Sequence, residues 1–154
     1  GVGIAAPQIG LSIRLFIVDT SPFSEDESLN DKDKSELKSF KKIFINPEIL
    51  DETGDDWSFE EGCLSIPNIR ESISRQESIK IQYFDENFNK HIESYEGLLA
   101  RVIQHEYDHI EGILFTDKLS SFKKQLLKKK LLKISSGKLS FDYEMKFHKS
   151  SKKK

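Results

Sequence analysis

The sequence predicts an α+β domain in which mainly antiparallel strands surround one central metal-binding helix, with a second helix near the C-terminus. Apolar residues recur at three- and four-residue spacing over residues 96–111, which is typical of a helix with one buried face. Other segments form short apolar runs or alternate apolar with polar residues, which is typical of strands. A length of 154 residues with 36% hydrophobic residues suits a single core.

The first strands are expected in the N-terminal half of the chain. Residues 15–18 form a short apolar run, and residues 42–46 form another that Pro47 is expected to end. Residues 20–40 lie between them and are rich in Ser, Asp, Glu and Lys. Because such a segment can bury little apolar surface, we expect an exposed loop. The acidic residues 51–60 are expected to form a solvent-facing turn that leads into a further strand.

A β-hairpin and two helices follow. Residues 78–85 alternate apolar and polar side chains, and residues 91–95 return after a polar turn. The far strand of this hairpin leads directly into the central helix of residues 96–111, which Gly112 is expected to end. The second helix is expected over residues 120–134, with one of the serines at its start as the N-terminal cap.

The net charge of −2 hides a strong asymmetry along the chain. Residues 1–117 carry a formal charge of −13, whereas residues 118–154 carry +11. The lysine-rich end is therefore electrostatically separate from the body. We expect one catalytic domain over residues 1–120 and a basic helix and tail over residues 121–154.

Composition also restricts the compartment. No run approaches eighteen apolar residues, and no charged segment followed by an apolar run opens the chain, so neither a membrane span nor a secretory signal is predicted. The single cysteine excludes an internal disulfide and favours a reducing compartment. We expect a cytoplasmic protein without a membrane or DNA partner. Because the chain opens on Gly1 rather than Met, we also expect a segment to precede it.

The clearest motif for chemistry is Gln-His-Glu-Tyr-Asp-His at residues 104–109, which reads H-E-x-x-H within the central helix. Side chains four residues apart share one helix face, so His105 and His109 can bind one divalent cation. Glu106 then lies beside that cation, where a carboxylate can take a proton from water and later deliver it to a leaving group. The alternative is a pair of core histidines satisfied by ordinary hydrogen bonds.

Cys63 is the candidate third ligand. It follows Gly62, where the backbone can bend to aim a thiolate. A lone cysteine is more often a small buried residue, but a two-histidine site needs a further donor. Three protein ligands leave the fourth position of a tetrahedral site open, which is typical of a catalytic metal. His91 and His148 are expected to be exposed residues rather than ligands.

Three blocks stand in order along the chain: Gly-Val-Gly-Ile-Ala-Ala-Pro-Gln at 1–8, Glu-Gly-Cys-Leu-Ser at 61–65, and the histidine motif at 104–109. Together they resemble the G-x-G-x-A-A-x-Q, E-G-C-L-S and Q-H-E-x-D-H motifs of the peptide deformylase family. Each block is weak by itself, whereas the ordered set is highly specific. The resemblance extends to about Ser120 and implies that the family's N-terminal helix would precede Gly1.

The resemblance implies a metal-dependent hydrolase that removes the formyl group from the N-terminal formyl-methionine of new bacterial polypeptides and releases formate. Cys63, His105 and His109 would bind the metal, while Glu106 would transfer the proton from water to the departing amine. The family assigns stabilisation of the developing oxyanion to the side chain of Gln8 and the backbone N–H of Leu64. It also suggests a supporting ion pair between Glu61 and Arg75, for which an ordinary surface pair is the alternative.

Further residues are expected at the substrate. The glycines would let the peptide backbone lie against the protein as an added strand, and the apolar helix residues would line the pocket for the methionine side chain. These residues are Val2, Gly3, Gly62, Leu98 and Val102. Arg101 departs from the apolar residue that some family members carry at its position.

The ligand set suits several metals. A thiolate and two imidazoles can bind Fe²⁺, Zn²⁺, Co²⁺ or Ni²⁺. The resemblance suggests Fe²⁺ in the cell, with Zn²⁺, Ni²⁺ or Co²⁺ in purified protein. The expected partners are formyl-methionyl nascent peptides, and the basic C-terminal tail is a candidate for contact with the ribosome. A solvated lysine face is the alternative for that tail.

Two other functions share part of this pattern. A zincin-type metallopeptidase contains H-E-x-x-H but normally finds its third ligand downstream of the motif, whereas Cys63 lies upstream. A non-catalytic binding module could keep the metal as a structural staple. Such a staple needs neither Glu106 nor Gln8, which favours the enzyme.

Overall fold

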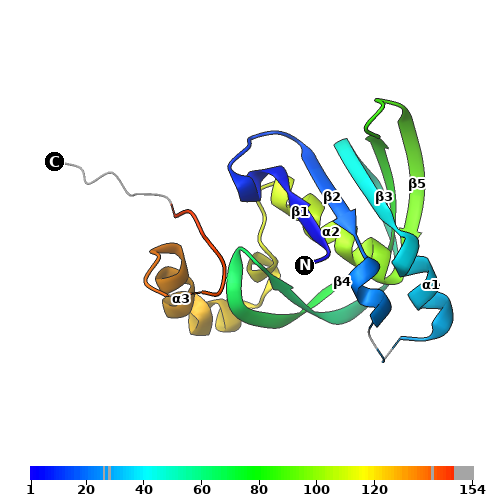
Figure 1. The fold of residues 1–154 in the computed structure, drawn as a ribbon. Helices are drawn as coiled ribbons and strands as arrows, with labels where there is room; N and C mark the ends of the chain where they lie inside the picture. Colours follow the sequence, from blue (N-terminus) through cyan, green and yellow to red (C-terminus); the bar gives the residue numbers. More distant parts are fainter. Residues whose placement is uncertain (26, 28, 140, 148–154) are drawn as a thin grey trace.

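The computed structural model describes residues 1–154 except 26, 28, 140 and 148–154. Within these residues the strands form one five-stranded antiparallel sheet in the order β1-β2-β3-β4-β5 (Figure 1). The prediction for His148 lies outside the described residues.

The elements occupy most of the described chain. The strands are β1 (Gly3–Ala5), β2 (Leu15–Asp19), β3 (Lys41–Cys63), β4 (Ile66–Phe84) and β5 (Lys90–Glu96). The helices are α1 (Asp31–Ser39), α2 (Gly97–Ile110) and α3 (Ser121–Ser135), with short 3-10 segments η1 (Ala6–Ile9), η2 (Ser21–Glu25) and η3 (Phe115–Lys118). The α+β prediction, with antiparallel strands around a central helix, is confirmed.

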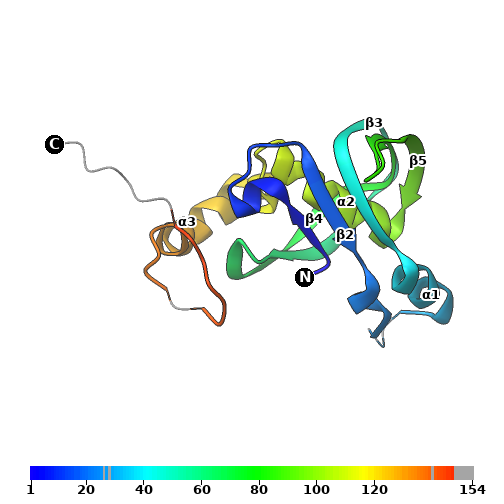
Figure 2. The ribbon, with the colours of Figure 1, turned by 45° about the horizontal axis from the view of Figure 1, so that its top comes forward.

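Helix α2 is the centre of the fold. It lies between the β1–β2 side and the β4–β5 side of the sheet and contacts all four of these strands (Figures 1 and 2). Its buried residues Ala100, Val102 and Ile103 pack against strand residues such as Phe44, whose ring lies 4.4 Å from that of Tyr83. Burial of this apolar face explains why the chain folds around the helix.

Strands β3 and β4 form a long hairpin that runs through the acidic region. The expectation that Pro47 ends a strand is wrong, because β3 continues to Cys63. Register shifts between Ile45 and Glu48 accommodate the proline, which can sit at such an irregularity because it has no N–H to pair. Residues 51–56 are solvent-facing as predicted, but they lie within this strand.

Residues 20–40 do not form the expected loop. They contain η2 and α1, and Leu37 of that helix is 3% exposed. The buried hydroxyl of Thr20 donates a hydrogen bond to the Leu37 carbonyl over 2.7 Å, which ties the two ends of the segment together. The buried side chain of Leu37 and the hydrogen bond of Thr20 therefore fix this segment to the domain, although its polar composition predicts an exposed loop.

The predicted hairpin and C-terminal helix are present, although β4 already begins at Ile66, before the predicted start at residue 78. Strands β4 and β5 pair from Ser78 with Glu96 to Phe84 with Lys90, as the predicted hairpin requires. Helix α3 begins after Ser120, whose hydroxyl accepts a hydrogen bond from the Lys123 backbone over 3.4 Å. No helix of the described chain is long and apolar enough to cross a membrane.

Candidate metal centre

The three expected ligands come together where the end of β3 meets α2. One ligand atom each from Cys63, His105 and His109 lies within 4.8 Å of the other two. The Cys63 sulfur is 3.3 Å from Nε2 of His109, and the two imidazole rings stand at 85° with centroids 5.0 Å apart. One thiolate and two imidazoles that face a common point fit a divalent transition metal with an open coordination position.

The surroundings of Cys63 favour its metal-binding form. Burial alone raises the pKa of the thiol, but hydrogen bonds from His105 and His109 lower the pKa to about 5. A hydrogen bond from the backbone of Ser65 acts in the same direction. The sulfur is therefore a thiolate at neutral pH, which is the form that binds metals.

Glu106 places a carboxyl group beside the ligands. The residue is 5% exposed, and its Oε2 atom is buried without a hydrogen-bond partner among the described residues. Burial raises the pKa of this carboxyl to about 7, although His105 and His109 act to lower it. A buried oxygen without a partner is rare and marks a place for a ligand or water. A carboxyl with this pKa is suited to accept and release a proton at neutral pH.

Gly3 is required by the position of Glu106. A Cβ atom added at Gly3 would lie 2.5 Å from Oε1 of Glu106 and 2.6 Å from its Cγ. The sequence suggests that this glycine makes room for substrate. In the structure it also makes room for the carboxylate, which a larger residue would displace.

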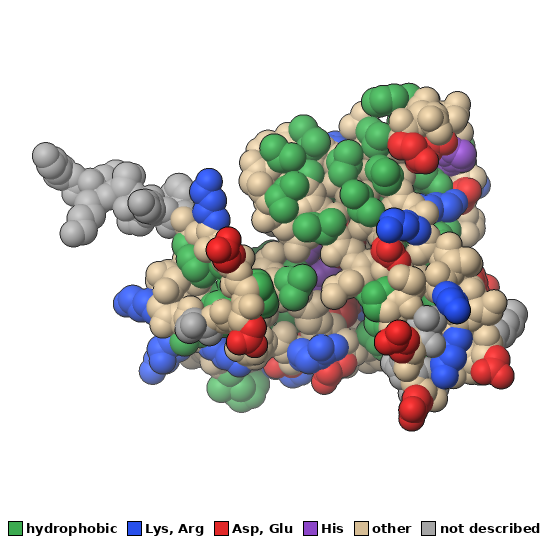
Figure 3. All heavy atoms as spheres, viewed as in Figure 1, with side chains coloured by type: hydrophobic (Ala, Val, Ile, Leu, Met, Phe, Trp, Pro, Cys, Tyr) green, Lys and Arg blue, Asp and Glu red, His purple; other side chains and the backbone are tan. Residues whose placement is uncertain are grey.

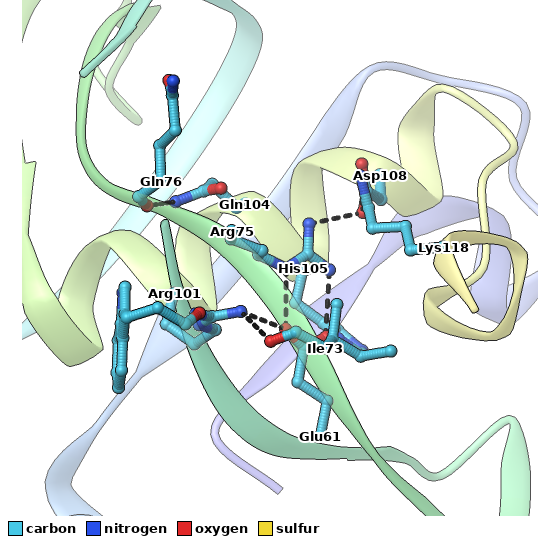
Figure 4. Close-up of polar contacts among 10 residues, drawn as sticks. Glu61, Ile73, Arg75, Gln76, Arg101, Gln104, His105, Asp108 and Lys118 are labelled. Atoms are coloured by element: carbon cyan, nitrogen blue, oxygen red, sulfur yellow. Dashed lines mark hydrogen bonds and ion pairs between the residues drawn. The ribbon is translucent and has the colours of Figure 1, made fainter. Parts of the chain in front are cut away.

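Glu61 is the centre of the polar network behind the site (Figure 4). It is 5% exposed and accepts hydrogen bonds from Arg75 Nε and Nη2 over 2.7 and 2.9 Å, and from Arg101 Nη1 over 3.0 Å. Burial alone raises the pKa of its carboxyl, but Arg75 and His105 lower the pKa to about 2. The expected Glu61–Arg75 pair is therefore present and buried, unlike the surface pair that was its alternative.

The same carboxylate orients one candidate metal ligand. Oε2 of Glu61 lies 2.9 Å from Nδ1 of His105. Such a contact holds the Nδ1 proton and leaves the other ring nitrogen free to bind a metal. Arg75 extends the network, because its Nη1 donates to Asp108 over 2.7 Å and so ties β4 to α2.

Arg101 is 2% exposed and its charge is directed into this network. Its Nη1 donates to the Ile73 carbonyl over 3.1 Å and its Nη2 to the Trp57 carbonyl over 2.6 Å. The guanidinium also lies over the Trp57 ring at 4.4 Å, a favourable cation–π distance. Both terminal nitrogens of Arg101 are paired in this way, whereas its buried Nε has no hydrogen-bond partner among the described residues. Arg101 can therefore border the cleft with most of its charge directed away from it.

Gln8 has a fixed orientation. Its Oε1 accepts a hydrogen bond from the Ala5 backbone over 2.7 Å, which leaves the NH₂ group directed toward the centre. Nε2 lies 3.0 Å from the hydroxyl oxygen of Ser65 and 3.5 Å from the Cys63 sulfur. The side chain is thus held as a donor beside the candidate metal ligands, close to the turn that contains Leu64.

A cleft of about 670 Å³ lies over the centre. Figure 3 shows a hollow on this face with histidine atoms visible inside it. Its lining includes nine predicted site residues: Val2, Gly3, Gln8, Gly62, Cys63, Leu64, Val102, His105 and Glu106. Leu98 is half-buried on α2 and is not among the lining residues, whereas Phe59 and Arg101 are.

Some residues at the site were given no role by the sequence analysis. Asp108 appears in the sequence only as part of the third block, yet it binds both Arg75 and Lys118, the latter over 3.3 Å. The hydroxyl oxygen of Ser65 accepts a hydrogen bond from the side-chain amide of Gln8. Tyr143 lines the cleft although it lies in a segment without a motif. Its contact with Leu64 spans 79 positions, which no local pattern can reveal.

Comparison with known proteins gives one consistent family. The family model for polypeptide deformylase matches residues 1–125. A peptide deformylase from Christiangramia forsetii is 59% identical over 152 residues, which are 99% of this chain and 78% of that protein. One from Flavobacterium psychrophilum is 61% identical over 146 residues, covering 95% of this chain and 75% of the relative.

Solved structures agree with the sequence relatives. A peptide deformylase from Legionella pneumophila matches with a TM-score of 0.70 and 36% identity, covering 90% of this chain and 73% of that one. A peptide deformylase from Synechococcus elongatus in complex with actinonin matches with a TM-score of 0.68 and 35% identity, covering 84% of this chain and 65% of the other.

Proposed function

Because this chain belongs to the peptide deformylase family, a family of metal-dependent hydrolases that remove formyl groups from nascent polypeptides, we propose specific roles for its site residues. Cys63, His105 and His109 bind the metal, and Glu106 is the general base. The observation that carries this assignment is the convergence of the three ligand atoms within 4.8 Å beside a buried carboxylate oxygen without a partner among the described residues.

The reaction is hydrolysis of the formamide bond. A divalent ion at this site would supply Lewis-acid activation of water and of the formyl carbonyl. Glu106 takes one proton from the attacking water and delivers it to the departing amine, so that the new C–O bond replaces the C–N bond and formate leaves. The Nε2 donor of Gln8 and the backbone N–H of Leu64 stabilise the negative charge that develops on the formyl oxygen.

The substrate assignments follow the walls of the cleft. We assign Val2, Gly3 and Gly62 to the peptide backbone, since β1 and the end of β3 border the cleft from two sides. Val102 is assigned to the methionine side chain. Leu98 remains a prediction for the same pocket, without support from the cleft lining.

The cellular metal is proposed to be Fe²⁺. A thiolate with two imidazoles also suits Zn²⁺, Co²⁺ and Ni²⁺, and the general affinity order favours Zn²⁺ over Fe²⁺ when both are supplied. The cytoplasm is the proposed location, because its reducing conditions protect both the ferrous ion and the Cys63 thiolate. Residues 1–120 are proposed as the catalytic unit.

A substrate panel tests the function. Metal-loaded protein should release formate from formyl-Met-Ala, and it should cleave neither acetyl-Met-Ala nor the peptide bond of a longer unblocked peptide. Cys63→Ala serves as the control and should lose bound metal together with formate release. Peptide-bond cleavage would favour a zincin-type peptidase, and metal retention by Cys63→Ala would remove Cys63 from the ligand set.

The lysines of α3 are proposed to contact ribosomal RNA. Lys123 is paired with Glu71 over 2.6 Å, and Lys130 donates to the Asn68 carbonyl, so these two help to dock the helix. Lys124, Lys128 and Lys129 are exposed on the same helix. A basic segment on an acidic body would orient the enzyme toward a polyanion.

A charge-matched comparison tests this contact. Replacing the exposed helix lysines Lys124, Lys128 and Lys129 by Gln should weaken co-sedimentation with ribosomes. The slope of the logarithm of the binding constant against the logarithm of the salt concentration should also fall, by an amount that corresponds to the loss of about three phosphate contacts. The control replaces Lys38, Lys80 and Lys90 by Gln. These three lysines are exposed on the body, so their replacement removes the same amount of charge. Equal loss in both triple variants would mean that only net charge matters, and no loss in either would leave the lysines as a solvated face.

A further inference from the structure

The end of the described chain reaches into the active-site cleft. The hydroxyl of Tyr143 donates a hydrogen bond to the Leu64 carbonyl over 2.6 Å. Leu64 and Ser65 form the turn between β3 and β4, and the Tyr143 side chain lines the same cleft as Glu106. Figures 1 and 2 show the segment after α3 returning to the tip of this hairpin.

The position of Tyr143 is set by packing around it. Gly137, with φ of 66°, reverses the chain after α3, and the Phe147 ring packs closely over this glycine. Leu139 and Phe141 pack against the second core cluster, which also includes Ile66, Ile69 and Ile73 of β4. The rings of Phe141 and Tyr143 are stacked with centroids 6.3 Å apart. The segment that carries Tyr143 is therefore anchored before this residue by Leu139 and Phe141 and after it by Phe147.

The Leu64–Ser65 turn is held by two side chains from distant parts of the chain. On one side, Nε2 of Gln8 donates to the Ser65 hydroxyl over 3.0 Å. On the other side, Tyr143 binds the Leu64 carbonyl. The Leu64 side chain itself is 57% exposed and contributes little packing. These two hydrogen bonds therefore help to set the orientation of the peptide groups in this turn, beside the Cys63–Ile66 strand pair and the Ser65 backbone hydrogen bond to Cys63.

We propose that Tyr143 is a positioning residue for deformylation. Its hydroxyl orients the turn so that the Leu64 N–H points toward the formyl oxygen, while Tyr143 itself touches no reacting atom. A donor to a developing oxyanion is effective only when it is already in place, so a freer turn slows the chemical step more than it weakens substrate binding. This inference rests on the proposed role of the Leu64 N–H.

Tyr143→Phe tests the proposal, since it keeps the ring on Phe141 and removes only the hydroxyl. We expect kcat for formyl-Met-Ala to fall roughly threefold to tenfold, as the loss of one neutral hydrogen bond allows, with KM, metal content and melting temperature unchanged. Glu144→Gln, at an exposed position of the same segment, is the matched control and should leave all four quantities unchanged.

Each other outcome overturns the inference. Unchanged kcat in Tyr143→Phe would do so directly. A fall in metal content or melting temperature that accounts for the loss would assign the hydroxyl a structural role, and a rise in KM alone would make Tyr143 a substrate contact. If Tyr143→Phe is normal but Tyr143→Ala is slow, the ring matters and the hydroxyl does not. Failure of the proposed function is separate, because it would appear as no formate release from formyl-Met-Ala by the metal-loaded wild-type protein.

Discussion

Replacing Glu106 by Gln should leave the metal in place and lower kcat by roughly a hundredfold to ten-thousandfold, the usual contribution of a positioned general base. The amide has nearly the same shape as the carboxylate but cannot accept the proton from water. Because Glu106 is not one of the three ligand residues, metal content should stay at the wild-type level. Metal analysis beside a formate assay measures both quantities.

Two further variants sharpen this result. Gly3→Ala leaves Glu106 chemically intact but introduces a Cβ atom 2.5 Å from its carboxylate oxygen, so it should also retain metal and lose activity by displacing the base. Glu96→Gln, at the start of the same helix and exposed, should behave as wild type. Near-normal turnover in Glu106→Gln would show that another group transfers the proton.

The second large effect is expected from Glu61→Gln, which should lower the free energy of unfolding by about 3 kcal/mol or more, the typical result of removing one partner of a buried ion pair. The variant leaves Arg75 and Arg101, which are 5% and 2% exposed, without their shared counter-charge. It also weakens the contact that orients His105, so metal affinity should fall roughly tenfold to a hundredfold.

The neighbouring residue provides the control for Glu61. Glu60 forms a pair with Arg70 over 2.9 Å in which both side chains are about two-thirds exposed, at 66% and 68%. Glu60→Gln should therefore change the unfolding free energy by less than about 1 kcal/mol, because exposed pairs contribute little. Urea titrations of both variants with bound metal measure the difference. Equal effects in the two would mean that burial of the Glu61 network adds no stability.

The limits of sequence reasoning are clear at particular elements. The stripe of apolar residues in α2 and the alternation in β4 and β5 are periodic over many residues, so both were predictable. Helix α1 was not, because its anchor is the single residue Leu37 in a polar segment. The prediction that Pro47 ends a strand was wrong for a related reason. The register shift that accommodates this proline within β3 leaves no local pattern in the sequence.

The sequence by itself determined the chemistry that the site can perform and the helix face that carries two of its ligands, because His105, Glu106 and His109 are placed by the geometry of one helical turn. Only the tertiary structure decided which distant groups complete that chemistry. The contact of Cys63 with His109 spans 46 positions, that of Glu61 with His105 spans 44, and each depends on how the β3–β4 hairpin packs against α2. Such contacts are products of packing, which local spacing does not specify.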